Sequence, residues 1–112
     1  KAVLLLDPET MQIQHQLPLP KKWEKEIKDL SDIAVDPLSG NLFVLSDENR
    51  TILELQLRTQ DGELDLAKVQ RIDIEGKGTG KIEQPEGITF DKKGDLFLTS
   101  EGSRRVYRYE RQ

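Results

Sequence analysis

An internal repeat constrains the fold of this sequence more than any other feature. The segment "LSDIAVDPLSGNLFVLSDENRTILEL" (residues 30–55) matches "PEGITFDKKGDLFLTSEGSRRVYRY" (residues 85–109) at an offset of 55 residues, which becomes 54 after one deletion in the first turn. Identities that hold their register across a single gap indicate two copies of one structural unit. The identical pairs include Ile33 and Ile88, Asp36 and Asp91, Gly40 and Gly94, Phe43 and Phe97, Ser46 and Ser100, and Arg50 and Arg104.

Each copy is typical of an antiparallel meander. Short segments rich in Val, Ile, Leu, Phe and Tyr alternate with the turn sequences "DPLSG" and "DKKG". In the first copy we expect strands at 32–35, 41–45, 51–57 and 68–74, with a loop at 58–65. In the second copy we expect strands at 87–90, 95–99 and 104–109. Four antiparallel strands per repeat is the pattern of one blade of a β-propeller.

The predicted fold class is therefore all-β, a partial β-propeller of about two and a half four-stranded blades. Residues 1–20 fit the last strands of one blade, residues 30–75 a complete blade, and residues 85–110 three strands of the final blade. The connection "PKKWEKEIKDL" is either about two turns of helix or irregular. An arc of blades exposes apolar faces and strand edges, so we expect a longer natural protein and a fragment that associates with copies of itself.

Composition limits the kinds of partner. Apolar residues make up 35% of the chain and charged residues 34%, which is a lean supply for an isolated core. The net charge of −4, without a basic block, argues against nucleic acid. Because no apolar run is long enough to span a bilayer, membrane attachment is expected only through an N-terminal anchor outside this sequence. The absence of cysteine excludes a thiol nucleophile and a Cys-type zinc site.

The segments "LSDIAVDPLSGNLFVLSDENRTILEL" and "QPEGITFDKKGDLFLTSEGSRRVYRY" resemble the C-terminal part of the SdiA-regulated (YjiK-like) family of bacterial proteins. The resemblance covers roughly residues 28–109 and implies a six-bladed propeller in an extracytoplasmic, periplasmic protein that is often tethered to the inner membrane. It implies no established reaction. The sequence departs from the family at Asp32, where Gly is favoured after Ser.

Carboxylates at the first strand of each blade suggest a cation site. The first strand of a blade lines the central channel, so Glu86 and its counterparts Ser31 and Asp32 would converge on one axis. Carboxylates brought together repel one another unless a hard cation such as Ca²⁺, which takes six to eight oxygen ligands, neutralises them. The alternative is structural: Glu86 accepts hydrogen bonds from backbone amides or pairs with a Lys or Arg.

The recurring Ser-acid-Arg motif has two interpretations. A serine nucleophile needs an adjacent base and a G-x-S-x-G elbow, and neither is present, so Ser46 and Ser100 are predicted to satisfy backbone amides in turns. Arg50 and Arg104 either pair with the acid three residues earlier or form an anion-binding rim, to which Lys81 of "GKGTGK" would add. That glycine-rich segment has the wrong spacing for a phosphate loop.

The sequence suggests two candidate functions. The first is a non-catalytic binding or scaffold domain of the bacterial cell envelope, stabilised by a central Ca²⁺, with a small ligand or an envelope protein as partner. The alternative is a propeller hydrolase of the phytase-like esterase kind, in which carboxylates and Ca²⁺ activate water for attack on a phosphoester or ester. The sequence favours the first, because basic residues are not clustered where a phosphoester would bind.

Overall fold

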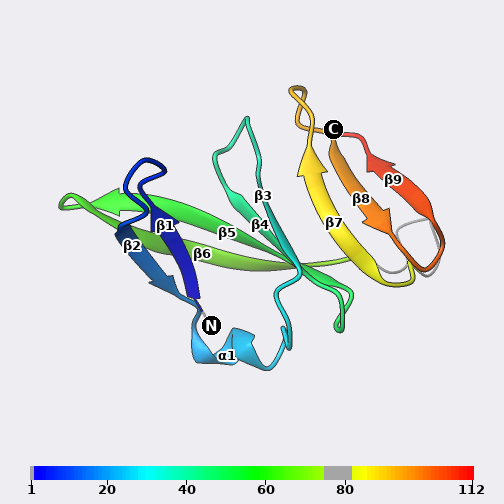
Figure 1. Ribbon diagram of the computed structural model, residues 1–112, viewed down its shortest axis with the longest axis horizontal. Helices are drawn as coiled ribbons and strands as arrows, with labels where there is room; N and C mark the ends of the chain where they lie inside the picture. The colour runs from blue at the N-terminus through cyan, green and yellow to red at the C-terminus, as the bar shows by residue number, and fades with distance from the viewer. Residues whose placement is uncertain (1, 75–81) are drawn as a thin grey trace.

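The computed structural model describes residues 2–74 and 82–112, and the fold within these residues is all-β, as predicted. Three antiparallel sheets of two, four and three strands lie side by side (Figure 1). We refer to them as the N-terminal, middle and C-terminal sheets. The N-terminal sheet consists of β1 (Ala2–Leu6) and β2 (Ile13–Pro18); the middle sheet of β3 (Asp32–Val35), β4 (Leu42–Ser46), β5 (Thr51–Gln60) and β6 (Glu63–Asp73); and the C-terminal sheet of β7 (Pro85–Phe90), β8 (Leu96–Ser100) and β9 (Arg105–Tyr109).

The first hairpins of the middle and C-terminal sheets turn in the same way. Gly40 and Gly94 both have positive φ angles, of 76° and 86°, a backbone conformation that glycine adopts without a steric penalty. The side chain of Asp36 accepts a hydrogen bond from the amide of Leu38, and Asp91 accepts one from Lys93. The turns predicted from "DPLSG" and "DKKG" are therefore present, and the Asp side chains organise them.

The middle sheet is buried on both faces at β4. Side chains alternate along a strand, so Phe43 and Leu45 enter one apolar core while Leu42 and Val44 enter the other. All five residues of β4 are buried. A strand of this kind cannot be stable in a single exposed sheet, since both of its faces would lose their apolar cover.

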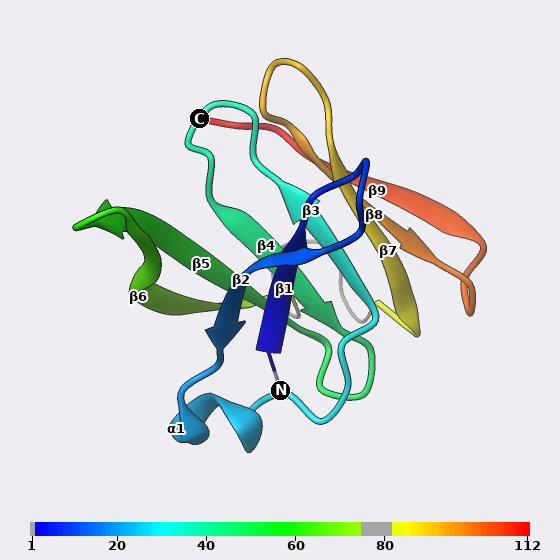
Figure 2. The ribbon, with the colours of Figure 1, turned by 60° about the vertical axis from the view of Figure 1, so that its left-hand side comes forward.

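The two neighbouring sheets supply that cover from opposite sides. The C-terminal sheet contributes Ile88 and Leu98 to the first core, where the rings of Phe43 and Phe90 meet edge-on at 4.9 Å. The second core is closed by Leu19, which follows β2, and by Ile27, which follows the short helix α1 (Lys21–Glu24). Figure 2 shows the β1–β2 hairpin in front of the middle sheet.

Two polar contacts join the middle and C-terminal sheets. At the start of β3, a carboxylate oxygen of Asp32 accepts a hydrogen bond of 2.9 Å from the backbone amide of Ile88 in β7. Near the other end, the guanidinium of Arg111 lies 2.7 Å from the buried carboxylate of Asp36. Arg111 follows β9, whose end pairs with the start of β8, and the start of β8 pairs with the end of β7. The contact at the start of β3 thus lies within β7 and the contact beyond the end of β3 lies beside the end of β7, so β3 and β7 run in the same direction (Figure 1).

Two predicted connections differ from the structure. The loop expected at residues 58–65 is instead the end of a long β5–β6 hairpin, which turns at Asp61 and Gly62 with φ angles of 52° and 79°. An Asp-Gly pair with two positive φ angles matches the twist of a hairpin, so the strands continue to the turn although their side chains are polar. Of the two alternatives for the connection after β2, the helix of about two turns is wrong: α1 has a single turn, after which Ile27 enters the core and Leu30 stays exposed.

Replacement of Arg111 by Gln is expected to lower the free energy of unfolding by about 1–3 kcal/mol, because it leaves the buried carboxylate of Asp36 without its charged donor. The matched control is Arg58→Gln, whose partner Asp65 is 57% exposed, and it is expected to cost about 0–1 kcal/mol. Urea denaturation of both variants measures the difference. Equal losses of stability in the two variants would contradict the conclusion that Arg111 connects the sheets.

The effect of Arg111→Gln should also depend on pH. Burial alone would raise the pKa of Asp36, but the hydrogen bond and charge of Arg111, with the donors Leu38 and Ser39, outweigh it and hold the pKa below its ordinary value. A lowered folded-state pKa stabilises the fold above the unfolded value of about 4 and ceases to do so as the pH falls through the folded value. The difference between Arg111→Gln and the original chain should therefore shrink below about pH 4.

Candidate functional site

The start of β7 brings together an acidic group of side chains from two sheets. Glu86 is the second residue of β7, and Glu101 follows β8, whose end pairs with the start of β7 through Pro85 and Ser100. Asp47 lies in the turn between β4 and β5 of the middle sheet, and its charge also acts on Glu86. We call Asp47, Glu86 and Glu101 the acidic group.

The acidic group changes the protonation of Glu86. A side-chain hydrogen bond with Glu101 is the main cause that raises the pKa of Glu86, and slight burial and the negative charges of Glu101 and Asp47 add to it. Two carboxyl groups can hydrogen-bond to each other only when one of them carries a proton. These neighbours therefore favour the protonated form of Glu86 more than water does.

The other two residues predicted beside Glu86 have structural partners of their own. Besides the amide of Ile88, Asp32 accepts a hydrogen bond from the amide of Ile33 at 2.8 Å. The hydroxyl of Ser31 donates to Asp29 at 2.5 Å and accepts from the amide of Asp47 at 3.1 Å. Ser31 and Asp32 thus lie at the same end of the sheets as Glu86, but their side chains organise the backbone.

The described side chains do not form a complete metal site. Among residues 2–74 and 82–112, no group of three or more His, Cys, Asp or Glu side chains is arranged to hold one. Glu86 and Glu101 offer the hard oxygen atoms that Ca²⁺ prefers, yet Ca²⁺ takes six to eight such ligands. These two carboxylates alone do not make a Ca²⁺ site.

Sequence reasoning missed Asp29, the most highly connected carboxylate at this end. Its two oxygen atoms accept hydrogen bonds from the hydroxyls of Ser31 and Ser46 and from the amides of Asp47 and Glu48. Burial works to raise its pKa, but these donors together hold the pKa below its ordinary value. The residue at the matched position of the second copy is Gln84, so the repeat carried no signal for Asp29.

The two serines of the motif have turn roles, as predicted. The hydroxyl of Ser46 donates to Asp29 at 2.6 Å and accepts from the amide of Asn49 at 3.4 Å. The hydroxyl of Ser100 donates to the backbone oxygen of Glu83 and accepts from the amide of Ser103. Both side chains are buried, and each organises the hairpin in which it lies.

The candidate anion ligands follow the same turns. Arg50 and Arg104 have the left-handed backbone conformation, with φ angles of 48° and 54°. Each directly precedes the next strand of its sheet, β5 and β9 respectively. A left-handed non-glycine residue is uncommon, and its recurrence at matched positions shows that the two turns share one geometry. Lys81 lies outside the described residues. The anion-binding rim stays a prediction.

A sequence model of the SdiA-regulated family matches residues 2–110 of the chain. The match covers nearly the whole sequence, so the chain belongs to the SdiA-regulated family. The resemblance that the repeat segments suggested is therefore confirmed.

Replacement of Glu86 by Gln is expected to stabilise the protein at neutral pH. The raised pKa of Glu86 means that the folded state favours its protonated form, so ionisation destabilises the fold above that pKa. Glutamine removes this penalty, and the gain should disappear below about pH 4, where Glu86 is protonated in the folded and unfolded states alike. Denaturation midpoints at pH 7 and pH 3.5 measure the effect. A variant less stable than the original chain at pH 7 would contradict the unfavourable interaction of ionised Glu86 with its acidic neighbours.

Proposed function

We propose that this chain forms consecutive blades of a β-propeller that acts as a non-catalytic binding or scaffold domain in the bacterial cell envelope. One observation carries the proposal: β3 and β7, the first strands of two matched segments, lie side by side and run in the same direction. If each sheet packs on the next in this way, with equivalent strands in contact at equivalent ends, the sheets form a ring around an axis.

The uncovered part of the middle sheet supports the same arrangement. Ile33 and Val35 of β3 are 45% and 57% exposed, although Val44 beside them is buried. A hollow of about 410 Å³ lies there, lined by Leu4 of β1, Leu30 and Ile33. If every pair of neighbouring sheets packs as β3 and β7 do, a further strand equivalent to β3 would occupy this hollow. That strand would belong to the N-terminal sheet, on the side of the free edge of β1.

The positions of the serine and histidine side chains support a non-catalytic role. The serines of both motifs are committed to their turns, and the sole histidine, His15, lies on β2. The cell-envelope location follows from the family alone. Within the described residues, no helix is long and apolar enough to cross a membrane.

The hydrolase is kept as a second candidate because Glu86 and Glu101 bring two carboxyl groups together near the proposed axis, where general acid–base catalysis needs such groups. Ca²⁺, when bound, would polarise a phosphoester and activate water there. Glu86, Glu101 and Asp47 would contribute oxygen ligands on one side of it, and ligands from further blades would complete the site.

Calcium binding tests the proposed cation site, and phosphoester hydrolysis distinguishes the two candidate functions. Calorimetric titration of the protein with Ca²⁺ is expected to show weak binding, with a dissociation constant of about 0.1–1 mM as in extracellular modules, and several-fold weaker binding after Glu86→Gln. The absence of heat would remove the Ca²⁺ site. Ca²⁺-dependent hydrolysis of a chromogenic phosphoester that Glu86→Gln abolishes would instead establish the enzyme.

Self-association tests the uncovered face. The 112-residue chain is expected to form dimers or larger species with rising concentration, because Ile33 and Val35 are exposed beside a free strand edge. The double variant Ile33→Ser, Val35→Ser should shift gel filtration towards the monomer. Met11→Ser is the control, since Met11 is also 66% exposed but lies in the turn between β1 and β2 and not on an edge strand. A clean monomer at high concentration would count against the proposal.

A further inference from the structure

A second hollow lies at the outer edge of the middle sheet, away from the acidic group. It has a volume of about 330 Å³ and is bounded by the start of α1 on one side and by β6 on the other. Trp23, Leu66 and Val69 form its apolar walls, and all three are half-buried members of the second core. The inner sides of these side chains are already packed in the core, so an apolar ligand in the hollow would contact their outer sides.

The strand edge at this hollow is unsuited to pairing with another strand. Gln56 pairs with Lys68 and Leu57 with Leu66, so Ala67 is an extra residue that forms a bulge in β6. Bulges and edge lysines are two of the devices by which proteins prevent strands from adding to an exposed edge. The hollow is consequently shaped for a compact molecule and not for an extended peptide.

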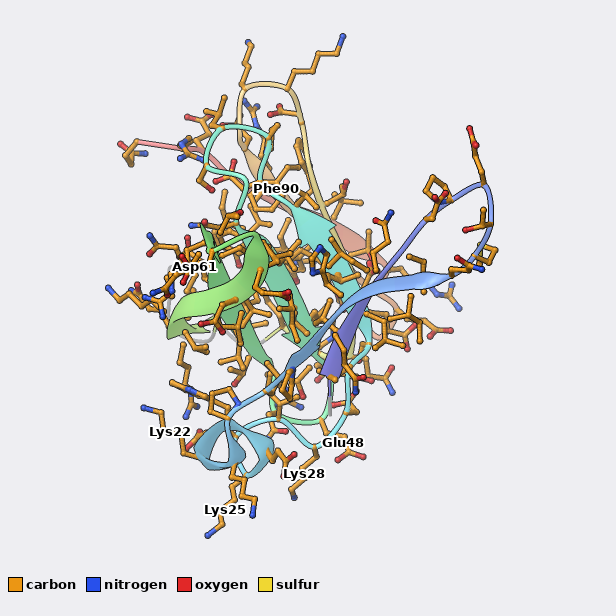
Figure 3. The ribbon with its side chains drawn as sticks, turned by 90° about the vertical axis from the view of Figure 1, so that its left-hand side faces the viewer. Lys22, Lys25, Lys28, Glu48, Asp61 and Phe90 are labelled. Atoms are coloured by element: carbon orange, nitrogen blue, oxygen red, sulfur yellow. The ribbon has the colours of Figure 1, made fainter. Side chains whose placement is uncertain are left out.

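The rim of the hollow is positively charged. Lys22 holds its ammonium group 5.1 Å from the centre of the Trp23 ring, and Lys68 lies on the opposite wall. Neither lysine forms an ion pair with a carboxylate among residues 2–74 and 82–112. The nearby carboxylate of Glu26 is occupied by Arg71 at 2.5 Å. Figure 3 shows Lys22, Lys25 and Lys28 together around α1 at one end of the molecule.

We propose that this hollow binds a small monoanionic molecule with an apolar body. The body would lie against Trp23, Leu66 and Val69, and the carboxylate would lie between Lys22 and Lys68. The volume is at the low end of the roughly 300–1,000 Å³ of typical ligand sites, which suits a short or medium-length carboxylate. This site is independent of the proposed Ca²⁺ and propeller function.

Fluorescence of Trp23 tests the site directly, because it is the sole tryptophan of the 112-residue chain. Titration with octanoate is expected to give a saturable blue shift of the emission as the ligand shields the indole from water. Octylamine has a similar apolar body with the opposite charge, and acetate has the charge without the body. Both are expected to bind at least about tenfold more weakly. Equal binding of octylamine, or a response that does not saturate, would overturn the proposal.

Variants identify the residues responsible. Lys22→Gln and Lys68→Gln should each weaken octanoate binding by up to about fivefold, the range of an exposed ion pair. The matched control is Lys92→Gln, an exposed lysine in the turn between β7 and β8, which should have no effect. Ala67→Phe, at an exposed position, should fill the hollow and abolish binding while both lysines remain. Octanoate binding that the three variants at the hollow, Lys22→Gln, Lys68→Gln and Ala67→Phe, all leave unchanged would also overturn the proposal.

Discussion

The contact between β3 and β7 is the interaction on which the rest of the structure depends. Each of these strands is the edge of its sheet, and an edge strand presents unpaired backbone groups. Asp32 satisfies one of them by accepting the amide hydrogen of Ile88, so a side chain of one sheet takes the place of a missing neighbouring strand. The same contact brings Ile88 against Phe43 and closes the first core.

The strands could largely be predicted from the sequence because their causes are local. Alternation of apolar residues determines which faces are buried. Asp36 determines the first turn through its side chain, and Gly40 through its positive φ angle. The extent of the β5–β6 hairpin was missed because its outer side chains are polar. Its length follows from the Asp61-Gly62 turn.

The candidate site could be predicted only in part, for a different reason. The pattern showed that Ser31, Asp32 and Glu86 lie at equivalent ends of their sheets, and they do. It could not show which atoms meet across the sheets. The direction of each side chain depends on the distance and angle between the sheets, which determine that Asp32 reaches Ile88 while Glu86 contacts Glu101. The same geometry determines the pairing of Arg111 with Asp36.

These contacts also explain why the proposed functions lie in different places. The acidic group lies where two sheets meet, so any role it has depends on how many equivalent sheets surround it. The hollow at Trp23 depends on one sheet and its connection. The family, by contrast, is shown by nearly the entire chain, since the matching model includes all three sheets.

The most direct test of the packing is the hydrogen-exchange rate of a single backbone amide, that of Ile88, measured by NMR. Its hydrogen bond crosses from one sheet to the other, 2.9 Å from Ile88 N to the carboxylate of Asp32, so its protection reports the contact itself. We expect slow exchange that becomes fast in Asp32→Ala while the amides paired within the C-terminal sheet stay protected. Exchange of the Ile88 amide at the rate of an open edge strand in the original chain would contradict the arrangement of the sheets.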